Sequence, residues 1–161
     1  MSVFQKTGPL SVLHAFIDAS RWRASLEKDA PARTDMISLY VLETGGCEGC
    51  AMEVESLCGS AFALERYGFT RVTEPADADW LLVTGAMSRA CVQMLDRVWQ
   101  AMPPGKSLVA VGACAVDGGL FGAGYATLGG LKALTQVCKT IPGCPPSPQD
   151  ILLGLQRLAG G

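Results

Sequence analysis

The hydrophobic and polar positions change period along residues 36–158. Five short apolar runs have the length and composition of strands, and they are MISLYVLE (36–43), FTRVT (69–73), DWLLVTG (79–85), SLVAVG (107–112) and VCKTI (137–141). Helical spacing predicts helices over 51–68 and 89–102, the first ending at Gly68. Strands alternating with helices predict an α/β fold, a mostly parallel sheet with helices on both faces.

The chain after residue 112 is less regular. Residues 113–130 are rich in glycine and predict a loop too long to be a simple connection. A turn or short helix is expected near Leu131. A last helix begins within SPQDILLGLQRL, with Ser147 as its N-cap and Pro148 in its first turn.

Apolar positions near one helical face predict an amphipathic helix over residues 9–26. Such a helix packs on its own domain, docks on another subunit or lies on a membrane surface, and the sequence leaves all three open. KDAPARTD (28–35) has the composition of a linker. The pattern therefore divides the chain into an N-terminal helix with its linker (1–35) and an α/β domain (36–161).

Composition narrows the class of protein. The 161 residues suffice for one domain with a sizeable core. Only 17% of them are charged, which favours a surface partly covered by partner proteins. The net charge of −2 and the lack of a basic tract exclude a nucleic-acid-binding protein.

The cysteine content points to chemistry rather than to a disulfide framework. No apolar run reaches the roughly 18 residues that cross a bilayer, and the N-terminal residues have no signal-peptide core. We therefore expect the chain to stay in the cytoplasm, where its seven cysteines, an odd number, should be reduced. Metal binding or catalysis is then the expected use of some of them.

Three of the predicted strand-to-helix loops carry cysteines. Cys47 and Cys50 follow the first predicted strand, Cys114 follows the fourth and Cys144 follows the fifth. Because such loops gather at the carboxyl edge of a parallel sheet, we expect these four thiols to converge. The remaining cysteines lie within or beside predicted elements and are expected to be inert, and they are Cys58, Cys91 and Cys138.

Four thiolates suit either a zinc ion or an iron–sulfur cluster. One CxxC pair joined by two remote cysteines favours a cubane with four iron corners over structural zinc, which commonly uses two tight pairs. Nearby glycines let the backbone approach a bulky inorganic core, and they are at positions 45, 46, 49, 112, 118, 119 and 143. The remaining interpretations are a thioredoxin-like pair at the CxxC and buried, inert thiols at Cys114 and Cys144.

Four motifs, in order, carry a resemblance to a known family, and they are GGCEGCAME (45–53), ADWLLVTGAMS (78–88), VAVGACAVDGGLF (109–121) and IPGCPPSPQDIL (141–152). The chain resembles the small subunit of [NiFe] hydrogenases, in the branch shared with the B subunit of respiratory complex I. In the first motif, complex I subunits have adjacent cysteines, whereas membrane-bound, energy-converting (group 4) hydrogenases have a CxxC followed by an acidic residue. Cys47-Glu48-Gly49-Cys50 follows the hydrogenase pattern, and Glu53 matches the family glutamate.

The resemblance implies a flavodoxin-like fold and one [4Fe–4S] cluster on Cys47, Cys50, Cys114 and Cys144. This cluster would be the one proximal to a nickel–iron centre in a separate large subunit, and the chain would have no catalytic centre of its own. Electrons would pass between that centre and ferredoxin-like iron–sulfur subunits. Membrane subunits of the complex would hold the chain at the cytoplasmic face of the inner membrane.

Two acidic residues stand beside the expected ligands. Glu48 and Glu53 are candidates for tuning the cluster potential or moving protons, with a solvated or interfacial carboxylate as the plainer interpretation. The family often has Pro-Arg-His-Ala-Asp before the third strand, whereas residues 75–79 here contain no arginine. Loss of that cation would shift the potential if it faced the cluster. Gly-Pro-Val-Thr, usual after that strand, is replaced at residues 85–88 by Gly-Ala-Met-Ser.

Two other functions fit the same residues. A complex I-type subunit would pass its electrons to a quinone rather than exchange them with nickel and iron. A zinc-stabilised structural module would use the four cysteines only to support the fold.

Overall fold

The computed structural model describes residues 36–135 and 139–160. These residues contain a five-stranded sheet in the order β2-β1-β3-β4-β5, with every neighbouring pair parallel. The strands are β1 (Ile37–Gly45), β2 (Phe69–Arg71), β3 (Trp80–Gly85), β4 (Ser107–Val111) and β5 (Lys139–Ile141). This order is the flavodoxin-like one, so the α/β prediction is confirmed.

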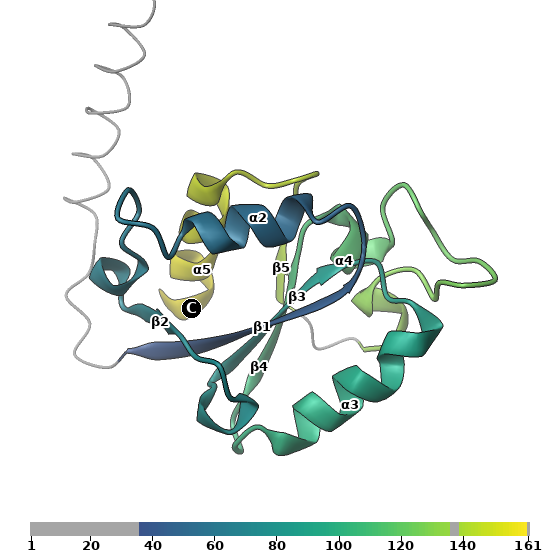
Figure 1. Cartoon of the computed structure of the whole chain (residues 1–161), viewed down its shortest axis with the longest axis horizontal. Helices are drawn as coiled ribbons and strands as arrows, with labels where there is room; N and C mark the ends of the chain where they lie inside the picture. The colour runs from purple at the N-terminus through teal and green to yellow at the C-terminus, as the bar shows by residue number, and fades with distance from the viewer. Residues whose placement is uncertain (1–35, 136–138, 161) are drawn as a thin grey trace, which may run out of the picture. The chain divides into compact units, whose positions relative to one another are not determined.

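Helices cover both faces of the sheet (Figure 1). The α-helices are α2 (Gly49–Ser56), α3 (Val92–Ala101), α4 (Ala113–Asp117) and α5 (Pro148–Gly160). Single 3-10 turns are η1 (Leu64–Tyr67), η2 (Pro75–Asp77), η3 (Arg89–Cys91) and η4 (Leu131–Ala133). Helices α2 and α5 lie on one face and α3 on the other, as right-handed parallel crossovers require.

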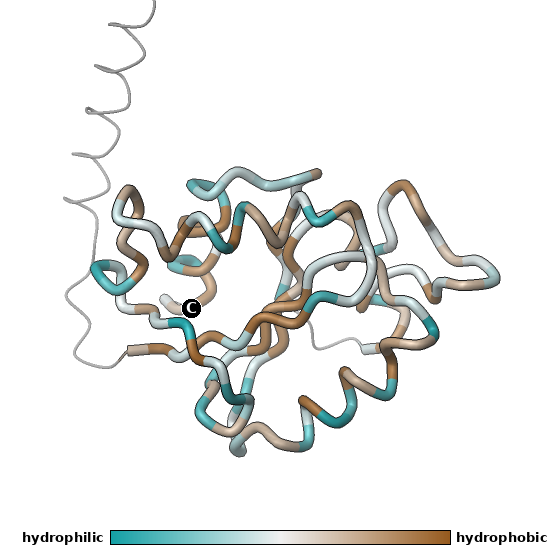
Figure 2. Tube along the Cα trace, in the orientation of Figure 1, coloured by the Kyte–Doolittle hydropathy of each residue, from teal (hydrophilic) through white to brown (hydrophobic). Residues whose placement is uncertain are grey.

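Strand β3 is the centre of the core. Residues 80–84 are all buried, because helices cover this strand from both sides. Leu81 and Val83 belong to the core cluster against which the apolar face of α3 packs. On the opposite face, Ile151 and Leu155 of α5 are fully buried. Figure 2 shows the most hydrophobic stretches of the trace running through the strands of the sheet.

Two predicted elements differ from the structure. The helix expected over 51–68 ends at Ser56, since Gly59 interrupts it and Ala63 has the left-handed φ of 48°. The chain then forms turns before η1. The segment 113–130 is not all loop, because its first residues form α4 and only 118–130 are irregular. Antiparallel bridges Ser88↔Thr127 and Ala123↔Leu128 then tie this loop down.

The start of α5 is confirmed as predicted. The Asp150 N–H donates to the Ser147 hydroxyl at 3.2 Å, and the Ser147 N–H donates to the Asp150 carboxylate at 3.3 Å. This reciprocal capping fixes the short loop between β5 and α5 that carries Cys144, whose peptide bond to Pro145 is cis.

The predicted helix over residues 9–26 and the boundary at residue 35 lie outside the described residues, and they stay predictions. Residues 137 and 138 of the predicted fifth strand are also outside them, and β5 begins at Lys139. Among residues 36–135 and 139–160, none of the helices has the length and apolar character needed to span a bilayer.

Candidate functional site

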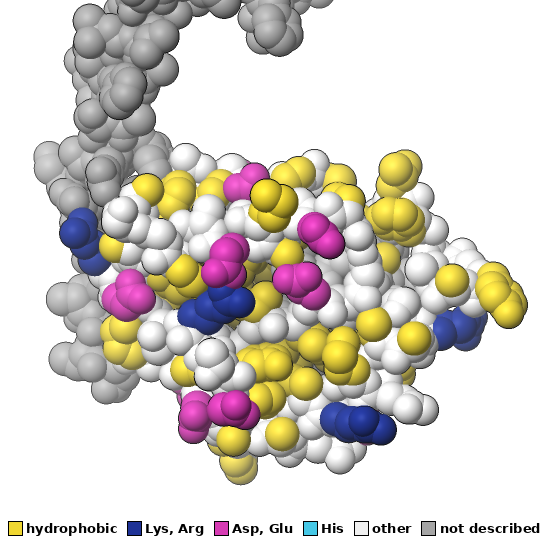
Figure 3. Space-filling view, in the orientation of Figure 1, with side chains coloured by type: hydrophobic (Ala, Val, Ile, Leu, Met, Phe, Trp, Pro, Cys, Tyr) yellow, Lys and Arg dark blue, Asp and Glu magenta, His cyan; other side chains and the backbone are white. Residues whose placement is uncertain are grey.

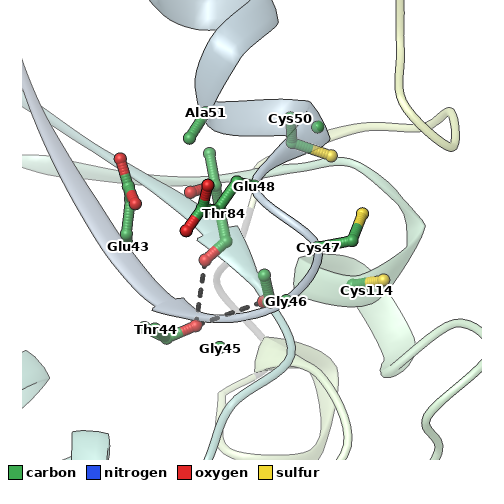
Figure 4. Close-up of a pocket in the computed structure, with 12 residues that line it drawn as sticks. Glu43, Thr44, Gly45, Gly46, Cys47, Glu48, Cys50, Ala51, Thr84 and Cys114 are labelled. Carbon is green, nitrogen blue, oxygen red and sulfur yellow. Dashed lines mark hydrogen bonds between the residues drawn. The ribbon is translucent and has the colours of Figure 1, made fainter.

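The carboxyl ends of β1 and β3, the segment from Gly46 to Ala51, and Cys114 surround a pocket of about 220 Å³. Cys47 lies in the loop after β1, Cys50 in the first turn of α2, and Cys114 in α4 directly after β4. Figure 4 shows these three thiols gathered on one side of the pocket. The sheet edge therefore brings together cysteines separated by more than sixty positions, as the strand order predicted.

Cys144 belongs to the same group by its electrostatics. The pKa of the Cys50 thiol is raised to about 11, first by burial and then by the charges of the other three thiols. The pKa of Cys114 is also raised, first by its own burial and then by Cys144 and Cys47. Because neighbouring thiols disfavour the ionisation of Cys50 and Cys114, these two thiolates are stable together beside the others only when a cation compensates their charge.

Exposure differs among the four cysteines. Cys114 is 7% exposed and Cys50 is half-buried, whereas Cys47 and Cys144 are exposed. The backbone N–H of Leu120 interacts with the Cys114 thiol and acts to lower its pKa, against the effect of burial. The site thus has a buried side against α4 and a side open to solvent or to a partner.

Glycines leave space in front of three of the sulfur atoms. A Cβ built on Gly112 would lie 2.4 Å from the Cys50 Sγ, and one on Gly119 would lie 3.2 Å from the Cys114 Sγ. At Gly49 a Cβ would lie 3.5 Å from the Cys47 Sγ. A side chain at Gly112 or Gly119 would crowd the sulfur where a bound group must fit, whereas one at Gly49 would make ordinary van der Waals contact. The donor set and this cradle fit an iron–sulfur cluster.

The other predicted glycines serve the backbone rather than the sulfurs. A Cβ on Gly46 would meet Gly85, and one on Gly118 would lie 2.8 Å from the Cα of Gly129. At Gly143 the obstacle would be the backbone of Pro146 at 2.5 Å. These glycines permit close chain crossings that shape the loops around the site.

Acidic side chains approach the pocket from β1 and from the CxxC. Glu48 lines the pocket with a left-handed φ of 64°, and Glu43 at the end of β1 lines it as well (Figure 4). No sequence pattern marked Glu43. Glu53 is half-buried in α2 and is not among the residues that line this pocket.

The segment that lacks the family arginine is far from the cysteines. Residues 75–79 precede β3, whose opposite end at Gly85 lines the pocket. The length of β3 separates the two by roughly 20 Å, at about 3.3 Å per residue. Absence of that cation therefore has no direct bearing on the site.

The other cysteines have separate surroundings. Cys58 is exposed after α2, and Cys138 lies outside the described residues. Cys91, expected to be inert, is half-buried, and its Sγ donates to the Thr44 carbonyl at 2.8 Å. Among the described residues, no group of three or more His, Cys, Asp or Glu side chains is arranged to hold a single metal ion.

Comparison with known proteins decides the family. The family model described as NADH ubiquinone oxidoreductase, 20 Kd subunit, matches residues 47–158. The chain belongs to this family. The matched segment of this 20 Kd subunit family member begins at Cys47 and contains all four converging cysteines.

Relatives of this family member include subunits of a formate hydrogenlyase and of an NAD(P)H-quinone oxidoreductase. Formate hydrogenlyase subunit 7 of Escherichia coli K12 is 38% identical over 122 residues, which cover 76% of this chain and 48% of that protein. The chloroplastic NAD(P)H-quinone oxidoreductase subunit K of Nymphaea alba is 33% identical over 158 residues, covering 97% and 65%. The chain thus spans about half to two thirds of the length of these two relatives. An uncharacterized protein of Methanocaldococcus jannaschii is 37% identical, with 79% and 85% covered.

Solved structures confirm the fold of this family member. A chain of an archaeal membrane-bound sulfane sulfur reductase aligns with a TM-score of 0.64 at 23% identity, over 83% of this chain and 74% of that one. A chain of an NAD+-reducing [NiFe]-hydrogenase aligns with a TM-score of 0.53 at 21% identity, over 74% and 92%. At these identities the likeness shows the shared α/β fold.

Proposed function

We propose that the chain is the electron-transfer subunit of a multi-subunit [NiFe] hydrogenase and holds one [4Fe–4S] cluster on Cys47, Cys50, Cys114 and Cys144. The observation that carries this proposal is the meeting of Cys47, Cys50 and Cys114 at one sheet edge, with Cys144 close enough to act on the pKa of Cys50. Their mutual electrostatic effect on Cys50 supports a cationic group between them. The glycines facing three of the sulfurs support a bulky group rather than direct packing of side chains.

A bound cluster would supply one-electron chemistry, and the chain itself makes or breaks no bond of a substrate. The protein's own part is to hold four thiolates at fixed positions. Burial of Cys114 keeps water from one side of the site, and the Leu120 N–H stabilises negative charge on its sulfur. Glu48 places a carboxylate in the pocket and tunes the potential, while Glu53 is the second candidate for that role or for moving protons.

The proposed partners are a large nickel–iron subunit, a ferredoxin-like iron–sulfur subunit and membrane subunits. Their complex would place the chain at the cytoplasmic face of the inner membrane. One relative is subunit 7 of a formate hydrogenlyase, which supports this assembly. Two large apolar side chains on the loop after α4 support a partner that covers this loop, since Leu120 is 94% and Tyr125 is 99% exposed. Figure 3 shows hydrophobic side chains standing out along this loop.

Electron delivery to a quinone is the second candidate. The similarity to subunit K of a quinone oxidoreductase, which extends over 97% of this chain, favours it. The two residues that separate Cys47 from Cys50 favour the hydrogenase branch instead, because the complex I pattern has adjacent cysteines.

Anaerobic purification of the chain with its native partners, followed by metal analysis, tests the proposal. We expect about four iron and four sulfide on this chain once it is separated anaerobically from its partners, and nickel in the large subunit that co-purifies with it. Iron and sulfide without nickel, together with quinone reduction, would assign the chain to the quinone branch. A colourless preparation with one zinc per chain would contradict both electron-transfer functions.

A further inference from the structure

Strand β1 ends in a bulge opposite β3. Glu43 pairs with Thr84 and Gly45 pairs with Gly85, so Thr44 is an extra residue without a partner in the ladder. Bulges are rare between parallel strands, and they re-aim the chain next to functional sites. This one stands directly before the Gly46-Cys47 turn into the cysteine site.

The Thr44 hydroxyl is buried among three carbonyl oxygens from the end of β3. Its Oγ1 lies 2.9 Å from Thr84 O, 3.2 Å from Gly85 O and 3.0 Å from Ala86 O. A hydroxyl has one proton, so it donates to one of these carbonyls at a time. Figure 4 shows the hydroxyl of Thr44 reaching across to this strand. The side chain thereby ties the bulge to β3.

The Thr44 carbonyl is held from the other direction. It accepts a hydrogen bond from the Cys91 thiol at 2.8 Å, across 47 positions of sequence. Cys91 is itself fixed, because its N–H donates to the Ser88 hydroxyl that caps η3. The side chain and the backbone of the bulged residue are therefore anchored to two different segments.

Gly45 and Gly85 meet backbone to backbone beside this anchor. A Cβ on Gly85, whose φ is +82°, would lie 2.5 Å from Gly45 O. Because the two backbones are closely packed here, a shift of the bulge would also move the chain that leads into Cys47.

We propose that Thr44 and Cys91 are positioning residues of the cysteine site, which lock the end of β1 so that Cys47 and Cys50 face Cys114. Their effect on a bound cluster rests on the proposed function. Their effect on the order of residues 45–51 does not, since it follows from the two hydrogen bonds alone.

The test uses the full chain purified anaerobically with its native partners. Thr44→Val and Cys91→Ala each remove one anchor, and Thr44→Ser and Cys91→Ser restore a donor in nearly the same place. The exposed Thr73→Val and Cys58→Ala are matched controls away from the bulge. Two quantities are measured in every variant: amide hydrogen exchange of residues 45–51 by mass spectrometry, and the midpoint potential of the bound cluster by redox titration with electron paramagnetic resonance.

Loss of either anchor should speed exchange of residues 45–51 about threefold to tenfold, the effect of about one net hydrogen bond. The midpoint potential should shift in the same two variants, and both serine variants should return both quantities to wild-type values. Unchanged exchange and potential in Thr44→Val and Cys91→Ala would overturn the inference, as would failure of the serine variants to restore them. If Thr44→Val does not fold, the comparison of Cys91→Ala with Cys91→Ser decides whether the inference holds. If the chain binds no cluster, the proposed function fails while the exchange result still decides this inference.

Discussion

Gly112 has no room for a side chain beside Cys50. A Cβ on Gly112 would lie 2.4 Å from the Cys50 Sγ, well inside van der Waals contact. Gly112 stands directly between the end of β4 and α4, so it lies where a group bound to both Cys50 and Cys114 would have to fit. The close contact between Gly112 and Cys50 allows the site to be tested by substitution.

Gly112→Ala should abolish cluster assembly while leaving the fold intact. Gly105→Ala is the control, because Gly105 also has a positive φ, +86° against +88° at Gly112, but nothing within 4 Å of its Cβ position. Both substitutions strain a backbone with a positive φ, the more so at Gly112, whose ψ of 155° lies in a region that essentially only glycine adopts. Only Gly112→Ala adds the clash with sulfur. Thermal unfolding and iron content of both variants measure the two effects. Equal iron content in the two variants would contradict the claim that Gly112 leaves space for a bound cluster.

Removing a proposed ligand should have a different signature from removing an inert cysteine. Cys114→Ser should lose most of the bound iron, because Cys114 is the buried member of the group. Cys58→Ser, at an exposed cysteine after α2, should retain all of it. Iron and labile sulfide per chain are measured side by side. Retention of a full four-iron cluster by Cys114→Ser would remove this residue from the ligand set.

Glu48→Gln should raise the midpoint potential of the cluster. Removing a negative charge from the pocket stabilises the reduced, more negative cluster. Exposure of Glu48 to solvent screens the effect to tens of millivolts, on the order of 1 kcal/mol or less for one electron. Glu65→Gln on η1, exposed and away from the pocket, is the control. Redox titration of both variants measures the shift, and a fall in potential for Glu48→Gln would be the wrong sign.

The raised pKa of Cys50 predicts a slow thiol in the cluster-free chain. Since its pKa is about 11 rather than the usual 9.0, the thiolate fraction near pH 7 should be about 100-fold lower than for an ordinary cysteine. The neutral thiol favours the folded state, so this contribution to stability is complete below pH 9 and is lost as pH rises through 11. The alkylation rate of Cys50 by iodoacetamide, resolved by peptide and compared with that of Cys58, measures the reactivity of the thiol. Equal rates for the two cysteines at pH 8 would contradict the burial of Cys50.

The sequence predicted the parts of the fold that hydrophobicity dictates locally. Strands β3 and β4 were found because a strand buried on both faces is an unbroken apolar run. The helix over 51–68 was predicted too long because its apolar spacing continues past Gly59, and α4 was missed because glycines follow it closely. Convergence of the four cysteines followed from strand order, which the alternating pattern already implied.

The anchors of the site had no such local signal. Thr44 and Cys91 are joined by a hydrogen bond across 47 positions, and the bulge that creates it depends on the register between β1 and β3. Glu43 reaches the pocket through the same strand end. Contacts of this kind arise from tertiary geometry and leave no periodicity in the chain, so only the structure reveals them.

We propose that this chain holds a single four-iron cluster on Cys47, Cys50, Cys114 and Cys144. The most direct measurement is the electron paramagnetic resonance spectrum of the anaerobically purified chain after reduction with dithionite, with spins counted against protein. A reduced-cluster signal of about one spin per chain, absent from Cys114→Ser and present in Cys58→Ser, is the predicted result. A wild-type chain that gives no iron–sulfur signal, or a signal unchanged in Cys114→Ser, would contradict the claim.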